Sequence, residues 1–419
     1  MSASKSYGRG AAILSLGIGA TGLITFAYFS LASHSLTEDE YGRITLLWSA
    51  VFITVSVLYR PVEQLLSRTI ADHDARGVGG THHLRVAATI QLALGVAFAA
   101  VALALRGPIQ DDLFGGSSTL YWILLVAVLA YAASYFARGY LAGHRLFPLY
   151  GGLVLMEATS RCLFALAVAI GIAEGQSAVA LGMAAAPIVS LAVVPWALGR
   201  HIRAPTESSG DTEFTLARGT GFALAVLLVM VAEQTFLNAG PLLVKATEDD
   251  GGAALAGFTF NVLLIARAPL QLFQSVQTSI LPHLTRLRAG GEDDPFARSV
   301  SLTLGAIAAF AAFVALVMLA GGPQIMDLLF GGEFDYERGG LVLIAAGMGL
   351  YLAAATLNQA LLAHGWAGRS ATCWVAAAAA FVLFLLLADF DDPVLQVEVA
   401  FVGAAALLAA ALYALYRRA

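Results

Sequence analysis

The chain has 419 residues, of which 59% are hydrophobic and only 12% charged, and its formal net charge is -5. This composition excludes an ordinary soluble globular protein and predicts a chain that lies in a lipid bilayer. The small net charge gives no indication of nucleic-acid binding. Two cysteines are too few for a disulfide framework, and no metal site is expected.

Apolar runs of about 20 residues, long enough to cross a hydrocarbon core of about 30 Å, recur along the whole chain. The first is interpreted as a retained helix rather than a cleaved signal peptide. The predicted spans are Ala11–Ser33, Ile44–Leu66, Val86–Leu105, Thr119–Ala142, Leu149–Ile172, Ala178–Leu198, Thr220–Val244, Ala253–Leu281, Val300–Leu319, Leu341–Ala363, Ala371–Leu387 and Val394–Leu415. We therefore expect an all-α polytopic membrane protein with twelve transmembrane helices.

Basic residues between the spans predict the orientation, because short loops rich in Lys and Arg stay on the cytoplasmic side. With the N-terminus inside, 16 of the 23 Lys and Arg residues are cytoplasmic, and Arg138 is counted among them. The outer loops instead collect acidic runs such as TEDE and EFDYE. We therefore expect a multi-pass protein of a bacterial cytoplasmic membrane, with both termini in the cytoplasm. Three arginines remain inside the membrane: Arg60, Arg161 and Arg267.

Three pairs of similar segments predict an internal duplication. They are LTEDEYG (36–42) with ATEDDGG (246–252), GPIQDDLFGG (107–116) with GPQIMDLLFGG (322–332), and PVEQLLS (61–67) with PLQLFQS (269–275). Each pair is separated by roughly 210 residues, about half the chain. We expect two six-helix halves, residues 1–200 and 215–419, joined by a cytoplasmic linker at 201–214. An even number of spans gives both halves one orientation, which predicts a pseudo-twofold axis along the membrane normal.

Charged residues at membrane depth are the main candidates for function, since each costs at least about 2.5–3.5 kcal/mol and usually faces a partner or a wet cavity. On the second span, Arg60 and Glu63 flank Pro61. On the fifth span, Glu157 and Arg161 are four residues apart, so that their side chains could pair on one helix. Either pair could simply lock helix packing, and Arg60 could instead extend toward the cytoplasmic surface.

The eighth span repeats this pattern with Arg267, Gln271 and Gln274 on one face. No acid lies within one helical turn of Arg267. Pro61 and Pro269 each remove a backbone donor, and we expect them to bend or loosen their helices. Because a guanidinium donates paired hydrogen bonds to phosphate oxygens, arginines at this depth favour an anionic substrate.

The seventh span carries Glu233 and Asn238. A desolvated carboxyl can take up a proton near neutral pH, so Glu233 is a candidate proton or cation site, although a neighbouring amide could equally well satisfy it. The run GIGATG (17–22) matches a dinucleotide-binding pattern but lies inside the first span, with no preceding strand. No cofactor is expected.

Together these features resemble the polysaccharide transporters and O-antigen flippases of the multidrug, oligosaccharidyl-lipid and polysaccharide exporter superfamily. The resemblance rests on the two six-helix halves, on LTEDEYGRITLLWSAV after the first span, on LFGGEFDYE before the tenth, and on the polar residues of spans two, seven and eight. It implies a flippase, not an enzyme, that moves an undecaprenyl-pyrophosphate-linked oligosaccharide across the membrane by alternating access for cell-surface polysaccharide synthesis. A polysaccharide polymerase or glycosyltransferases would be its partners.

The resemblance also implies roles for individual residues. Arg60 and Arg267 would hold the pyrophosphate, with Arg161, Gln271 and Gln274 as further substrate contacts, and Glu233, Glu157 and Asn238 would serve ion coupling.

Two other functions are compatible with the sequence. A drug or small-molecule exporter of the same fold is the nearer alternative, although related drug exporters often carry an acid on the first helix and this chain has none there. A membrane-embedded glycan polymerase or ligase is less favoured, because such enzymes usually place catalytic residues on a large outer loop. The longest predicted outer loop, GGPQIMDLLFGGEFDYERGG, has no histidine.

Overall fold

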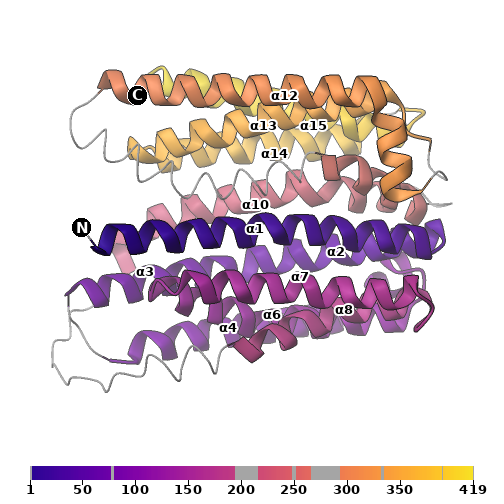
Figure 1. The fold of residues 1–419 in the computed structure, drawn as a ribbon, viewed down its shortest axis with the longest axis horizontal. Helices are drawn as coiled ribbons and strands as arrows, with labels where there is room; N and C mark the ends of the chain where they lie inside the picture. The colour runs from indigo at the N-terminus through magenta and orange to yellow at the C-terminus, as the bar shows by residue number, and fades with distance from the viewer. Residues whose placement is uncertain are drawn as a thin grey trace. The chain divides into compact units, whose positions relative to one another are not determined.

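The computed structural model describes residues 2–76, 80–193, 216–247, 252–265, 293–331, 335–388 and 390–418, and all regular structure in these ranges is helical (Figure 1). The elements are α1 (Ser2–Ser35), α2 (Glu38–Leu58), α3 (Arg60–Arg76), α4 (His82–Ala104), α5 (Arg106–Pro108), the π-helix η1 (Ile109–Leu113), α6 (Ser118–Gly143), α7 (Phe147–Ala169), α8 (Gly175–Ser190), the 3₁₀ turn η2 (Leu191–Val193), α10 (Leu216–Thr247), a helix at Gly252–Ile265, α12 (Asp293–Phe330), α13 (Arg338–Ala363), α14 (Ala367–Leu387) and α15 (Pro393–Tyr416).

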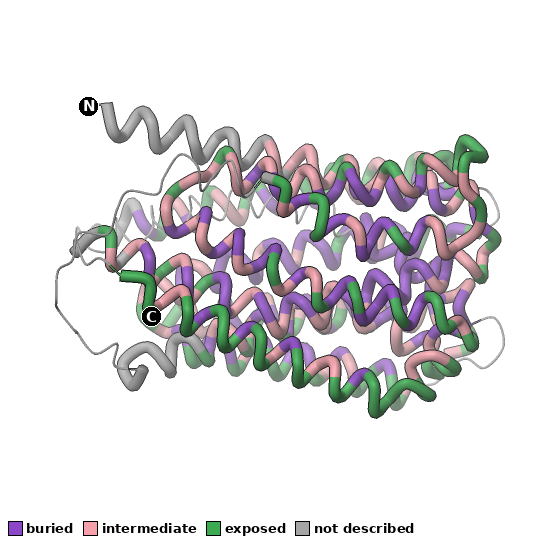
Figure 2. Tube along the Cα trace, turned by 90° about the horizontal axis from the view of Figure 1, so that it is seen from below, coloured by how far each residue is buried: buried purple, intermediate pink, exposed green. Residues whose placement is uncertain are grey.

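Within these ranges, nine helical stretches are long and apolar enough to cross a membrane, and two shorter apolar helices accompany them. Figure 2 shows that buried positions run along one side of many of these helices and exposed positions along another. Many of the exposed positions are large and apolar, including Leu92 and Val96 on α4, because the surrounding solvent is hydrocarbon rather than water. The predicted linker at 201–214 and the part of the eighth span after Ile265 lie outside the described residues.

The helices form two compact units. The first comprises Met1–Leu36 and Leu46–Leu216, and the second comprises Thr37–Thr45 and Ala217–Ala419. In the first unit, α1 packs on α7, α3 and α4 pack on α6, and α8 packs on both α6 and α7. In the second unit, α13 packs between α12 and α15, and α14 packs on α15.

The second predicted span is interrupted where the sequence places a proline. Helix α2 ends at Leu58 and α3 begins at Arg60, while the backbone of Tyr59 keeps its hydrogen bonds to Val55 and Glu63, both at 2.9 Å. Pro61 has no N–H to donate to the preceding turn, which accounts for the interruption. The helix therefore loosens at Pro61, as its position predicts, and places Glu63 on the first turns of α3.

The second unit has an aromatic core and also includes a segment from the start of the second span, residues 37–45. Phe236 stacks on Phe381 at 5.5 Å between ring centroids and meets Tyr351 edge-on at 5.7 Å. Residues 37–45 belong to this unit although they lie in the first half of the sequence. The Tyr41 hydroxyl donates to Asn261, whose amide in turn donates to the Tyr336 hydroxyl at 3.1 Å.

The turns after α6 and α13 have the same geometry. Arg145 and Gly365 both adopt left-handed backbone conformations, with φ of 57° and 78°. In both turns the next residue's amide donates to the carbonyl five residues earlier: Leu146 to Leu141 at 2.8 Å and Trp366 to Leu361 at 2.9 Å. Such a turn after a helix usually carries glycine, which Gly365 supplies and Arg145 does not. This repetition supports the internal duplication that the sequence predicts.

The duplicated LFGG segments also share their local structure. Phe114 and Phe330 are both fully buried, and the glycines that follow them, Gly115 and Gly331, both have positive φ, at 57° and 91°. A short helical stretch precedes each phenylalanine. Before Phe114 it is α5 with η1, and before Phe330 it is the part of α12 that follows a kink at Gly321. Both halves therefore end their third span with a short helix anchored by an aromatic ring.

Close packing of α6 on α3 depends on Gly139. A Cβ atom there would lie 2.9 Å from the Glu63 carbonyl oxygen and 3.1 Å from its Cα, whereas one at Gly152 on α7 would meet nothing within 4 Å. We expect Gly139→Ala to destabilise the protein by about 1–3 kcal/mol, despite the better helix propensity of alanine. Thermal unfolding in detergent measures this as a lower Tm. Gly152→Ala is the matched control and should not lower it; equal Tm values for the two variants would contradict the close approach.

Candidate functional site

An ion pair between two neighbouring helices lies at the centre of the polar interior of the first unit. Arg138 of α6 pairs with Glu157 of α7, and their side chains are only 12% and 2% exposed. The carboxylate also accepts hydrogen bonds from Ser134 on α6 and, at 3.3 Å, from Ser190 at the end of α8. Three helices thus converge on one buried carboxylate. Such a pair neutralises two charges that would each be costly in a bilayer.

Arg161 lies one turn further along α7 in an aromatic surrounding. Its guanidinium carbon is 5.1 Å from the centre of the Trp48 ring and 5.6 Å from that of Phe52, and it donates to the Tyr131 hydroxyl at 2.6 Å. The residue is 4% exposed, and no carboxylate among the described residues is within ion-pair distance of it. The ring faces and the hydroxyl therefore stabilise this cation in place of an acid.

Glu63 forms a further polar contact within the same unit. The Tyr150 hydroxyl of α7 donates to its carboxylate at 2.9 Å, and Glu63 is 9% exposed. The Arg138 guanidinium also lies 4.6 Å from the centre of the Tyr135 ring on α6. The polar interior therefore extends from α3 across α6 to α7 and α8.

Several buried polar atoms of the first unit have no hydrogen-bond partner among the described residues. They include the Tyr28 hydroxyl on α1, Oγ of Ser49 on α2 and Nε of Arg138. Buried polar groups nearly always find a partner, so each of these atoms is energetically costly where it lies. The interior of the first unit therefore carries more polar groups than the hydrogen bonds among its described residues satisfy.

The structure gives Glu157 a different partner from the one that the sequence predicts. The spacing of four residues favours pairing with Arg161 on the same helix, but Glu157 pairs with Arg138 across the helix interface. The assignment of Arg138 to a cytoplasmic segment is likewise wrong, since this residue is buried within a candidate span, Ser118–Gly143. Arg138 therefore joins the arginines placed inside the membrane, and Arg161 does not form the predicted pair with Glu157.

The other predicted site residues fall in different places. Arg60 is half-buried at the start of α3, three residues before Glu63, and takes part in an interaction of its own. Arg267, Gln271 and Gln274 lie outside the described residues, as does Pro269. The structure thus buries Glu157 and Arg161 on the same helix with different partners, Arg138 and Tyr131 respectively. The substrate and ion-coupling roles predicted for these residues stay predictions.

Polar groups of the second unit are arranged differently. Asn238 is buried on α10 and donates to the side chain of Gln234 at 3.0 Å, while Glu233 is half-buried and also has a partner. On α15, Glu398 is buried with its carboxylate against Gly340, where a Cβ would lie 2.1 Å from Oε2. Glu398 is an intramembrane acid that the sequence analysis missed, although an acid inside the last apolar run is the signal that could have found it.

No protein-family model matches the chain. The relatives found by sequence are uncharacterized proteins of Mycobacterium tuberculosis, one from strain H37Rv and one from strain CDC 1551. Each is 26% identical over 381 residues, covering 85% of this chain and 80% of the relative. The alignment therefore extends over most of both proteins.

Solved transporter structures share the fold. The eukaryotic MATE transporter AtDTX14 matches with a TM-score of 0.68 at 13% identity, over 98% of this chain and 95% of that one. A multidrug resistance MATE family transporter of the MOP superfamily matches in an inward-facing conformation, with a TM-score of 0.65 at 14% identity and 97% coverage of both chains. An outward-facing conformation of such a transporter matches at 0.62 and 13%, over 98% of this chain and 95% of that one.

These likenesses confirm the predicted fold class, an all-α membrane protein with the twelve-helix, two-lobed architecture of MATE transporters. At 13–14% identity these likenesses show the fold, and no O-antigen or polysaccharide flippase is among the matches described.

Neutralising Glu157 tests whether its pair holds the first unit together. Glu157→Gln leaves Arg138 as a buried cation without a counter-charge, and we expect a loss of about 3–5 kcal/mol in the free energy of unfolding. A large drop in Tm in detergent would report it. Glu174→Gln is the same chemical change at an exposed position before α8 and should leave Tm unchanged. A Glu157→Gln protein as stable as the wild type would exclude a stabilising pair.

Proposed function

We propose that the chain is a membrane exporter that works by alternating access and carries small amphipathic organic molecules. The observation that carries this proposal is the full-length likeness to MATE transporters, which include the inward-facing and the outward-facing conformations described above. Both of those structures are of multidrug resistance transporters. Alternating access needs a fold that can adopt both conformations, and this fold does so in those proteins. On this proposal the chain moves its substrate without chemical conversion.

The polar interior of the first unit supports a transport role. Ionisable side chains inside membrane helices are expensive, and they commonly mark a substrate or ion pathway. Here Glu63, Arg138, Glu157 and Arg161 are all buried or nearly so in candidate spans, and buried polar atoms without a partner among the described residues belong to the same unit. The excess of Lys and Arg in the predicted inner loops supports an orientation with both termini in the cytoplasm of a bacterial cell.

A second candidate substrate is a lipid-linked anionic glycan, the class that the sequence resemblance implies. One observation favours it: Arg161 is a buried cation with no carboxylate partner among the described residues. A planar guanidinium with unused donors can bind a phosphate or pyrophosphate oxygen pair. The second form of the proposal is therefore a flippase for a lipid-linked glycan, in which Arg161 contacts the anionic group.

Transport by the purified protein in liposomes separates the two candidates. One assay follows efflux of a cationic amphipathic dye, and a second follows movement of a fluorescent polyprenyl-pyrophosphate analogue between leaflets. We expect wild-type protein to move at least one of these probes faster than empty liposomes. If the wild-type protein shows a cooperative thermal unfolding transition but moves neither probe, the result would contradict the exporter proposal.

Arg161→Met then tests the anionic form of the substrate. If Arg161 binds the pyrophosphate, the variant should lose about tenfold or more in transport of that analogue, because a charge-assisted hydrogen bond contributes about 1.5–3 kcal/mol. Arg298→Met, at an exposed position near the start of α12, is the matched control and should retain activity. Unchanged transport of the analogue by a folded Arg161→Met protein would exclude the role of Arg161 and leave the exporter proposal standing.

A further inference from the structure

Glu398 places a buried carboxyl inside the last membrane helix of the second unit. The residue belongs to the candidate span Pro393–Tyr416 and is only 6% exposed. Its carboxyl rests against the first turn of α13, where a Cβ atom at Gly340 would collide with it. A Cβ atom at the neighbouring Gly339 would meet nothing within 4 Å. The packing of α13 on α15 therefore encloses this carboxyl at a position that a glycine leaves open.

The Glu398 carboxyl has no partner that would stabilise a negative charge. No described residue donates a hydrogen bond to it, and no described Lys, Arg or His lies within ion-pair distance of it. The first amides of α13 are close by, but none of them is bonded to Glu398, and the Leu341 amide donates to the Glu337 carbonyl at 3.2 Å. The N-terminus of α13 therefore does not replace the missing counter-charge by hydrogen bonds.

The charged groups that face Glu398 are themselves acidic. Asp392 lies directly before α15 and Glu337 directly before α13, and both act on Glu398 through their charge. Among the described residues, no basic side chain offsets them at Glu398. An ionised Glu398 would be a third negative charge at this place, and it would be the buried one. Burial and repulsion therefore both oppose its ionisation.

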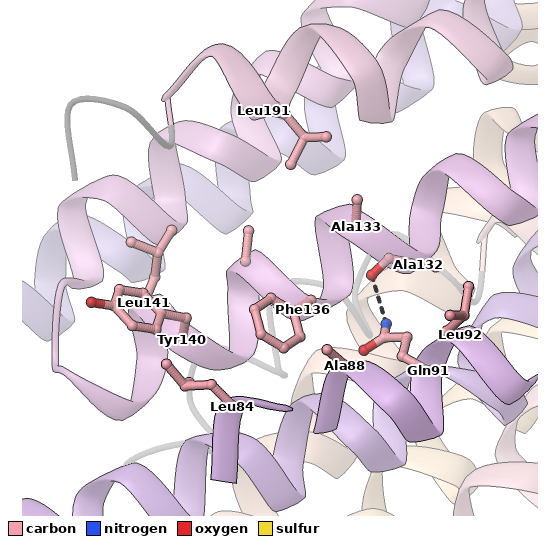
Figure 3. Close-up of a pocket in the computed structure, with 11 residues that line it drawn as sticks. Leu84, Ala88, Gln91, Leu92, Ala132, Ala133, Phe136, Tyr140, Leu141 and Leu191 are labelled. Carbon is pink, nitrogen blue, oxygen red and sulfur yellow. Dashed lines mark hydrogen bonds between the residues drawn. The ribbon is translucent and has the colours of Figure 1, made fainter. Parts of the chain in front are cut away.

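Neighbouring polar side chains show what a buried group can bond to in these spans. Gln396, two residues before Glu398, donates from its side-chain nitrogen to two backbone carbonyls near the end of α14, at 3.1 and 2.8 Å. In the first unit, Gln91 likewise donates to the Ala132 carbonyl at 2.6 Å (Figure 3). The available partners are acceptors. An ionised carboxylate can only accept, whereas a protonated carboxyl also has an O–H to donate.

We propose that Glu398 is a proton-binding site, which holds its proton at neutral pH while α13 packs on α15. The proton neutralises the buried carboxyl without help from any other side chain. A metal ion would need several oxygen ligands, and no group of three or more His, Cys, Asp or Glu among the described residues could hold one. Loss of the proton leaves a buried anion beside two acids and so weakens the contact between the two helices. The proposal does not depend on what the protein transports.

Infrared spectroscopy of the purified full-length protein detects the proton directly. A protonated carboxyl absorbs at a frequency where neither a carboxylate nor a glutamine side chain does. We expect the spectrum of the wild-type protein at neutral pH to contain the band of one protonated carboxyl that the spectrum of Glu398→Gln lacks. The band should shift in heavy water, as an O–H group requires. A difference spectrum without this band would overturn the proposal.

Thermal unfolding as a function of pH gives a second readout. Glutamine copies the protonated carboxyl, so Glu398→Gln and the wild type should unfold at the same Tm at about pH 5. Because the unfolded carboxyl ionises freely and the buried one does not, the wild-type Tm should fall below that of the variant as the pH rises to about 9. Glu174→Gln, at an exposed position, should follow the wild type throughout. Parallel curves for Glu398→Gln and the wild type would contradict a bound proton.

A pair of glycine variants locates the proton in the helix contact. Gly340→Ala puts a methyl group where the carboxyl lies, so it should displace the carboxyl and remove the infrared band at neutral pH. Gly339→Ala is the matched control and should keep the band. A Gly340→Ala protein that folds and keeps the band unchanged would overturn the proposed place of the proton. The comparison with Glu398→Gln decides the proposal even if Gly340→Ala does not fold.

Discussion

Charge must be neutralised inside a bilayer, and in the first unit the ion pair between Arg138 and Glu157 meets this constraint. The pair links α6 to α7, and Ser190 adds α8 to the same carboxylate. Because a lone charge at this depth is strongly unfavourable, the three helices can keep their polar side chains inward only while the pair is intact. The outer faces of these helices can then be mostly apolar and meet the lipid directly.

Helix α6 has two different inner surfaces, and this determines where chemistry can occur in the first unit. One surface carries the ion pair and the hydroxyl that contacts Arg161; on the other, Phe136 and Tyr140 pack on apolar side chains of α3 and α4. Gly139 lets α3 approach closely. A single helix thus separates a charged interior from an apolar one.

The sequence predicts the spans well because hydropathy is a local property that each segment carries by itself. The loosening at Pro61 is predictable for the same reason, as it follows from one missing donor. Partners across helices are not predictable in this way. The i to i+4 rule points from Glu157 to Arg161, but packing brings Arg138 from another helix to the carboxylate and surrounds Arg161 with Trp48 and Phe52.

Charge-counting in loops also has a limit, which Arg138 illustrates. It lies near the end of a predicted span, where a side chain can reach either the membrane surface or the interior, and only the position of Glu157 on the neighbouring helix decides between them. Glu398 was overlooked because a single acid hardly changes the hydropathy of a long apolar run. Aromatic rings pack inside both units, and in the first they lie beside a buried ion pair.

Thermal unfolding of a double-mutant cycle, Arg138→Met, Glu157→Met and the two combined, measures whether this ion pair is the interaction on which the first unit depends. Each single variant leaves one buried charge alone, whereas the double variant leaves none. We predict that the double variant unfolds at a higher Tm than either single variant. A double variant that is less stable than both, with losses that simply add, would contradict this account.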